Sequence, residues 1–198
     1  MSDLSQRLQA AVAQVLQDAA EDEQVEFHAG ASADAFLHLE QLTQTHLPED
    51  FKAVYSQLNG QNEDSVLVFE GEEWLSLERV ADEWGVWKDL LDNGTFAHGG
   101  NAMGSSDAEA GIQSVWWSPK WLPFTYDGSG NHLCIDLDPA AEGTYGQVIR
   151  MWHDNPSRTL EAHSFGAWLE AYVQGLEAGE FVYTEDYRAI INIEDAAD

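Results

Sequence analysis

Apolar residues recur three and four positions apart in five stretches of the chain, which is the pattern of amphipathic helices. Ser32 and Ser76 stand where the second and fourth stretches begin, and serine at that position caps the first turn of a helix. The pairs Asn59-Gly60 and Asn93-Gly94 supply left-handed stops after the third and fourth stretches. The predicted helices span residues 4–20, 33–46, 48–58, 77–91 and 165–179, and the last of them ends at 175 if Gly175 stops it.

Short runs of aromatic and β-branched residues, split by turn residues, predict strands in the second half of the chain. The predicted strands are residues 66–69, 115–117, 122–126, 133–137, 147–152 and 181–183. Residues 94–113 are rich in glycine and serine, and we expect a mobile loop there. Helices that precede strands, without a βαβ rhythm, favour an α+β fold in which an antiparallel meander sheet is flanked by helices.

The net charge of −28, from 36 acidic and 8 basic residues among 198, is spread over both halves of the chain. A field of that sign repels phosphate backbones, so it argues against nucleic-acid binding, and it steers basic partners toward the surface. Solubility or adaptation to salt explains the same charge without any partner. The length fits a single domain, residues 1–198, and the hydrophobic content of 44% is that of a globular protein.

The sequence indicates a cytoplasmic protein without a cofactor. It has no apolar run of about 20 residues to span a membrane, and the first residues carry acids where a signal peptide needs an apolar stretch. Its one cysteine, Cys134, has no internal partner for a disulfide or for a cysteine-based metal cluster.

Residues 127–131, Asp-Gly-Ser-Gly-Asn, are typical of a turn between two strands. A calcium loop that also used Asp138 is the alternative, but its sixth position needs glycine and holds His132. We therefore predict a hairpin connection and no metal site.

Alternation along residues 132–138 sends His132, Cys134, Asp136 and Asp138 to one face of the predicted strand. A cysteine beside a histidine and an acid suggests a small hydrolase that uses Cys134 as nucleophile. Alternate residues on a strand stand about 7 Å apart, which is too far for the thiol to reach its base. A polar rim with a half-buried cysteine is the favoured interpretation, and the protein is predicted not to be an enzyme.

Several short motifs follow one another in an order that resembles the SUKH superfamily, which includes bacterial toxin-immunity proteins and a fungal regulator of cell-wall synthesis. The matching segments are Leu47–Tyr55 with Asn59-Gly60, Trp74–Leu77, Trp121–Phe124, Asp127–Asn131, Leu133–Asp138, Gly146–Ile149 and Ser164–Leu169. The resemblance covers residues 30–180 as a SUKH-like core and leaves residues 1–25 as an N-terminal helical appendage. It implies that the protein has an α+β fold and acts by binding another protein.

Together, charge and resemblance predict an immunity-type protein that neutralises a basic partner by occlusion, for example a cognate toxin domain of the nuclease or deaminase type. A general regulatory or scaffold protein of cell-wall or stress pathways is the other possibility besides the hydrolase. Most tryptophans should lie in the core, and one exposed tryptophan among acids would mark a binding hot spot. The predicted partner-binding residues are Trp121, Asp127, Asn131, His132, Asp136 and Asp138, and the oligomeric state is left open.

Overall fold

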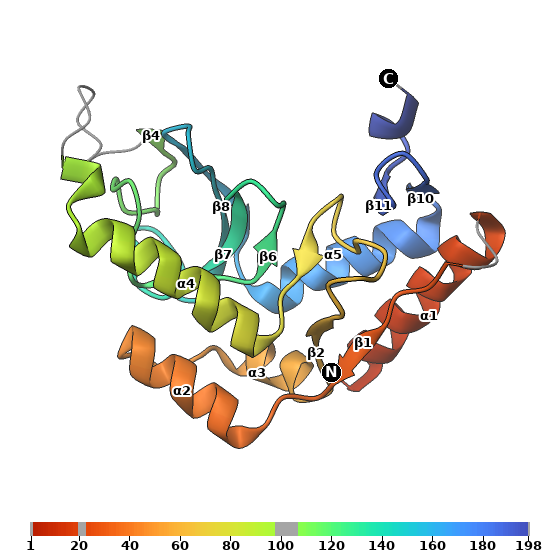
Figure 1. The fold of residues 1–198 in the computed structure, drawn as a ribbon, viewed down its shortest axis with the longest axis horizontal. Helices are drawn as coiled ribbons and strands as arrows, with labels where there is room; N and C mark the ends of the chain where they lie inside the picture. The colour runs from red at the N-terminus through yellow and green to blue at the C-terminus, as the bar shows by residue number, and fades with distance from the viewer. Residues whose placement is uncertain (1, 20–22, 98–106, 198) are drawn as a thin grey trace.

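The computed structural model describes residues 2–19, 23–97 and 107–197 (Figure 1). The helices are α1 (Ser2–Ala19), α2 (Ala33–Thr43), α3 (Glu49–Tyr55), α4 (Leu77–Asp92) and α5 (Phe165–Ala178), with short 3-10 helices η1 (Thr95–Ala97) and η2 (Asp195–Ala197). The strands are β1 (Phe27–Ala29), β2 (Leu58–Gln61), β3 (Glu73–Trp74), β4 (Asp107–Ala108), β5 (Trp121–Pro123), β6 (Thr125–Tyr126), β7 (His132–Asp136), β8 (Gln147–Met151), β9 (Ser157–Ala162), β10 (Phe181–Thr184) and β11 (Ala189–Asn192).

The main sheet has the strand order β4-β9-β8-β7-β5. Strands β7, β8 and β9 form an antiparallel meander, β5 adds to it antiparallel to β7, and β4 pairs parallel with β9. The predicted α+β fold with a meander sheet flanked by helices is confirmed.

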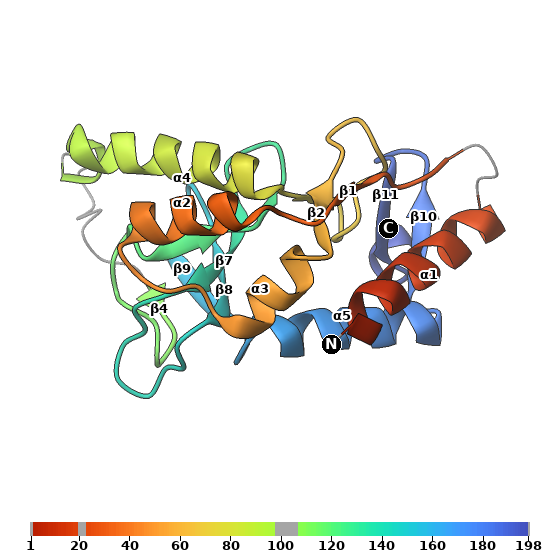
Figure 2. The same cartoon turned by 90° about the horizontal axis from the view of Figure 1, so that it is seen from below.

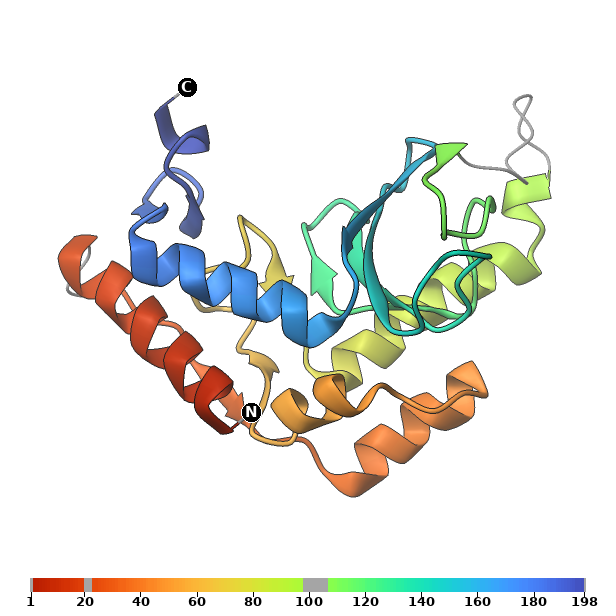
Figure 3. The same cartoon turned by 180° about the vertical axis from the view of Figure 1, so that it is seen from behind.

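The helices flank this sheet in two pairs. Figure 2 shows α2 running alongside α4, and α1 running alongside α5. From behind, the sheet stands between α4 and the beginning of α5 (Figure 3). Within the described residues, none of these helices combines the length and the apolar character needed to cross a membrane.

The helix starts follow the local sequence closely. Ser32, Ser76 and Ser164 each accept a hydrogen bond from the backbone N–H three residues later, at 3.2, 3.3 and 3.2 Å. At the other end of α5, Gly179 adopts a left-handed conformation. Capping of this kind depends only on neighbouring residues, and the corresponding predictions are confirmed.

The third predicted helix ends earlier than its sequence indicates. Helix α3 stops at Tyr55, and Leu58–Gln61 pairs with β1 as strand β2. Asn59 has a tertiary role instead of a capping role, because its side-chain oxygen accepts the Leu77 N–H at 2.8 Å, at the start of α4. Gly60 has φ +74° and lies so close to the Leu75 carbonyl that a Cβ would be 2.6 Å from its oxygen. The pair therefore joins β2 to α4, and the prediction of a helix stop there was wrong.

Two of the predicted strands are absent from the described residues. Residues 66–69 make only isolated bridges, from Leu67 and Phe69, and residues 115–117 form no strand. Strands β1, β4, β9 and β11 were not predicted. The expected mobile loop at 94–113 includes residues 98–106, which lie outside the described residues, while its two ends contain η1 and β4.

Aromatic rings join the helices to the sheets at the centre of the molecule. Trp74 is fully buried, its ring contacts Phe27, Tyr55 and Phe69, and its indole N–H donates to the Tyr55 hydroxyl at 2.7 Å. That hydroxyl donates in turn to the Leu75 carbonyl at 3.0 Å. Because both polar groups have hydrogen-bond partners, the cost of desolvating them is offset in the core.

Helix α1 buries its apolar face instead of projecting from the domain. Leu4, Leu8, Val12 and Leu16 are buried against α5 and β10. On the same side, Arg7 forms ion pairs with Glu170 and Glu177 of α5, both at 2.8 Å. The division of the chain into an appendage and a core stays a prediction, but α1 packs as part of the core.

We predict that Leu8→Ala destabilises the protein by about 2–5 kcal/mol, because it leaves a cavity at a fully buried position. Gln9→Ala, on the exposed face of the same helix, should change the free energy of unfolding by no more than about 0.5 kcal/mol. Urea unfolding of both variants measures the difference. Equal stability of the two would show that α1 is an appendage after all.

Candidate partner-binding surface

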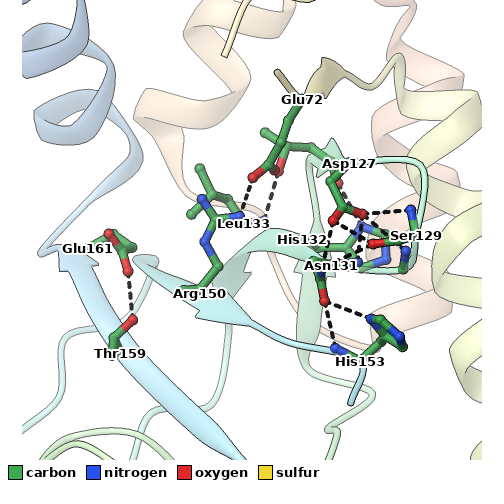
Figure 4. A network of polar contacts seen from close by, with 12 residues as sticks. Glu72, Asp127, Ser129, Asn131, His132, Leu133, Arg150, His153, Thr159 and Glu161 are labelled. Carbon is green, nitrogen blue, oxygen red and sulfur yellow. Dashed lines mark hydrogen bonds and ion pairs between the residues drawn. The ribbon is translucent and has the colours of Figure 1, made fainter. Parts of the chain in front are cut away.

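The turn between β6 and β7 is built around one carboxylate (Figure 4). Asp127 accepts backbone N–H bonds from Ser129, Gly130 and Asn131 at 2.8, 3.1 and 3.0 Å. The Ser129 hydroxyl and the Asn131 amide also donate to it, both at 2.6 Å. Burial opposes the charge of Asp127, but these donors outweigh it and lower the pKa of the carboxyl to about 2. The turn is the predicted one, and it holds Asp127 ionised.

Asn131 joins this turn to the end of β8. Its side-chain oxygen accepts both the backbone N–H and the Nδ1–H of His153, each at 2.9 Å. The exposed imidazole of His153 is thereby fixed beside the turn (Figure 4).

His132 lies under the turn and is fully buried. Its Nε2 is 3.1 Å from the Trp87 indole nitrogen, and its Nδ1 is 2.6 Å from the Thr125 carbonyl oxygen. An indole N–H only donates, so Nε2 must accept and Nδ1 must carry the proton. Burial is the main cause that lowers the pKa of His132, to about 4. The ring is therefore a neutral structural link between α4 and β6.

A buried ion pair supports the same hairpin from the other side. Arg150 of β8 pairs with Glu72, which also accepts the hydroxyl of Thr125. Thr125 in turn accepts the Leu133 N–H at 2.7 Å. Burial raises the pKa of Glu72, and Arg150 counters this shift. Removing either partner would leave an uncompensated buried charge. The ion pair and Thr125 therefore connect β8 and the segment before β3 to β6 and β7.

Beside the turn lies a pocket of about 370 Å³ between α4, η1 and the hairpin. Its lining includes Val86 and Trp87 of α4, Phe96 of η1, and Tyr126, Gly130 and His153. Glu83 is at its edge, paired with Arg79 at 3.2 Å. Val86 is 55% exposed although it is apolar. The pocket thus combines aromatic walls with a carboxylate at its edge.

The six residues predicted to bind a partner differ in their accessibility. Asp138 is exposed and Asp127 is half-buried, so both can reach a partner. Asn131 is mostly buried and holds His153.

Trp121, His132 and Asp136 are fully buried, which corrects the prediction that they contact a partner directly. Trp121 and Asp136 lie opposite each other on β5 and β7. Asp136 accepts a hydrogen bond from the Gln147 amide at 2.9 Å. These side chains are covered because both faces of β7 are buried, which alternation along one strand does not reveal.

Cys134 is fully buried as well, which corrects the expectation of a half-buried cysteine on a polar rim. It lies in the middle of β7, opposite Pro123 and Ile149 on the neighbouring strands. Burial raises the pKa of its thiol well above the usual range. A thiol in this environment is not an activated nucleophile, so the hydrolase interpretation loses its main residue.

Sequence reasoning missed the pocket residues Val86, Phe96 and His153. One signal was present: Val86 is an apolar residue on the polar face of a helix whose inward positions are Val80, Trp84 and Trp87. The other pocket residues come from segments far apart in sequence, and only the fold brings them together.

Comparison with known proteins identifies relatives among fungal regulators. The model of the SMI1 / KNR4 family (SUKH-1) matches residues 30–171. "Cell wall assembly regulator SMI1" of Saccharomyces cerevisiae is 33% identical over 75 residues, which are 38% of this chain and 15% of that protein. "Glucan synthesis regulatory protein" of Neurospora crassa is 24% identical over 189 residues, covering 79% of this chain and 35% of that protein. The chain therefore spans about a third or less of the length of these relatives.

We predict that His132 makes the stability of the fold depend on pH. Its pKa in the folded state, about 4, lies below the ordinary 6.5, so the unfolded chain binds the extra proton first as pH falls. The stability that His132 contributes is complete above pH 6.5 and is lost toward pH 4. The free-energy difference between wild type and His132→Gln should therefore shrink over this range. A constant difference would contradict the neutral, buried histidine, and His163→Gln, which removes an exposed histidine, is the control.

We also predict that Cys134→Ala leaves binding to a protein partner unchanged, because the thiol reaches neither the surface nor an activating base. The measurement is the dissociation constant of the complex, with circular dichroism to verify the fold. Loss of binding or of biological activity in a folded variant would revive the hydrolase interpretation.

Proposed function

Since the chain belongs to the SMI1/KNR4 family (SUKH-1), we propose that it is a non-enzymatic regulatory protein that acts by binding a basic segment of another protein. The names of its fungal relatives support a regulatory role. The observation that most directly indicates a basic partner is the distribution of charge in this chain.

Each of the eight basic side chains is bonded inside the chain. Arg7, Lys52, Arg79, Lys88, Arg150 and Arg188 pair with carboxylates. Lys120 donates to the Thr43 and Gln44 carbonyls, and Arg158 donates to the carbonyls of Asn155, Ser157 and Trp116. With 36 acids in the chain, most carboxylates are left without a cationic partner of their own. Cations for them must come from solution or from another molecule.

An immunity protein that occludes a basic toxin domain would use the same charge. Nothing among the relatives named above points to a toxin, so we favour a regulatory partner over a toxin. A scaffold whose acids serve only solubility is distinguished by the experiment below, because it needs no specific basic partner.

We predict that association with the partner slows by about tenfold or more between 0.05 and 0.5 M salt, because screening shortens the range of the attraction. Dissociation should change much less, because it depends on desolvated contacts. The partner is found by proximity labelling in the host, and the purified pair is then measured by surface binding kinetics. Asp138→Asn, at an exposed acid, tests the end of β7 in the same assay.

Two results would contradict this function. One is a purified partner whose association rate is flat with salt. The other is the failure of every labelled candidate to form a complex with the purified protein.

A further inference from the structure

The pocket between α4 and the 127–131 turn has a largely aromatic lining, although the chain as a whole is strongly acidic. Trp87 and Phe96 stack with ring centroids 5.8 Å apart on one wall. Tyr126 also lines the pocket and stacks on His132 with ring centroids 5.5 Å apart. Trp116 also lines the pocket. Its volume of about 370 Å³ falls in the range of about 300–1,000 Å³ that is usual for ligand sites.

Acidic groups surround this pocket in excess over cations. Glu83 at its edge shares a single guanidinium, that of Arg79, with Glu73, at 3.2 and 3.3 Å. One oxygen of Glu73 is buried without a hydrogen-bond partner among the described residues. Two carboxylates for one guanidinium leave a net negative charge beside the aromatic wall.

Two pKa shifts are consistent with that field. Burial raises the pKa of Tyr126, and the charges of Glu83 and Asp127 raise it further. Burial also raises the pKa of Glu83, and Arg79 counters this shift. A cation that entered the pocket would relieve both the repulsion and the burial cost.

A guanidinium group fits these features better than an ammonium group does. It is planar, so it stacks on aromatic rings, and its forked donors match a carboxylate. Its aliphatic stem would lie along exposed Val86. Two guanidinium groups of this chain already contact the lining: Arg79 lies 5.9 Å from the centroid of the Tyr126 ring, and Arg158 lies 5.3 Å from that of Trp116. These rings therefore accept guanidinium groups, and the two carboxylates that share Arg79 leave charge for a further one.

We propose that this pocket binds an arginine side chain of a partner protein, which stacks on the aromatic lining and pairs with Glu83 beside Arg79. The proposal rests on the proposed function and names the residue type and the place by which the basic partner is anchored. Acids elsewhere on the surface would attract the partner, and the pocket would hold it.

The test uses a capped nine-residue peptide in which arginine alternates with serine, titrated into the full ¹⁵N-labelled chain. We expect shifts of the Trp87 and Trp116 indole signals and of the Ser129, Gly130 and His153 amides. The analogue with citrulline in place of arginine keeps the shape and loses the charge, and the lysine analogue keeps the charge and loses the plane. Both should bind at least about fivefold more weakly, since citrulline lacks the charge that pairs with Glu83 and lysine lacks the plane that stacks on the rings.

Two variants with matched controls locate the site. Val86→Lys should weaken binding of the arginine peptide by about tenfold. Leu37→Lys, at a similarly exposed position on α2, should weaken it by less than about twofold. Glu83→Gln should weaken it by about tenfold, and Asp89→Asn, which removes an exposed acid of the same helix, by less than about twofold. These four substitutions are judged only after their spectra show an intact fold.

The outcomes separate this proposal from the function on which it rests. Shifts that map elsewhere, equal losses in a variant and its control, or equal binding of the lysine or citrulline analogue would overturn the arginine pocket. None of these would change the salt dependence of association with the whole partner. If that association were flat with salt while the peptide bound in the pocket, the charge-driven function would fail and the arginine site would stand.

Discussion

Eight basic residues face 36 acidic ones in this chain, and the fold uses all eight internally. Five of them tie together segments that are far apart in sequence. Arg7 joins α1 to α5, Arg150 joins β8 to the segment before β3, and Arg188 joins the C-terminal hairpin to Glu23. Lys120 holds the C-terminal end of α2, and Arg158 joins β9 to Trp116. The scarce cations therefore stabilise the fold, and the charges that they leave without a partner are carboxylates.

The same shortage of basic residues explains why the carboxylates of the hairpin are satisfied while those beside it can attract a cation. Arg150 neutralises the buried Glu72, and the Asp127 turn satisfies its own carboxylate with five hydrogen bonds. Beside the pocket the charges are not fully neutralised, because Arg79 pairs with both Glu73 and Glu83. A rigid aromatic wall next to an incompletely neutralised carboxylate is an arrangement that favours a cation from outside.

Local features of the sequence were sufficient for the helix starts at Ser32, Ser76 and Ser164 and for the turn at Asp127, because each depends on residues within four positions. Predictions failed where a distant contact decides the conformation. Asn59 forms a bond to the start of α4, and the backbone of Trp116 is held by Arg158 of β9, so neither segment follows its local pattern. In the candidate site, alternation assigned the residues of β7 to two faces but could not show that both faces are buried by the rest of the fold. The acids Asp127 and Asp138 were found by pattern, while Val86 and His153 are brought together only by the fold.

The central claim is that a basic partner docks over the pocket between α4 and the 127–131 turn. Hydrogen–deuterium exchange on the purified complex tests it most directly, because backbone amides report contact without any substitution. The account predicts that the partner slows exchange in residues 83–96 and 126–131 and leaves the exposed face of α2 unchanged. Protection concentrated on α2, with none at residues 83–96 and 126–131, would contradict it.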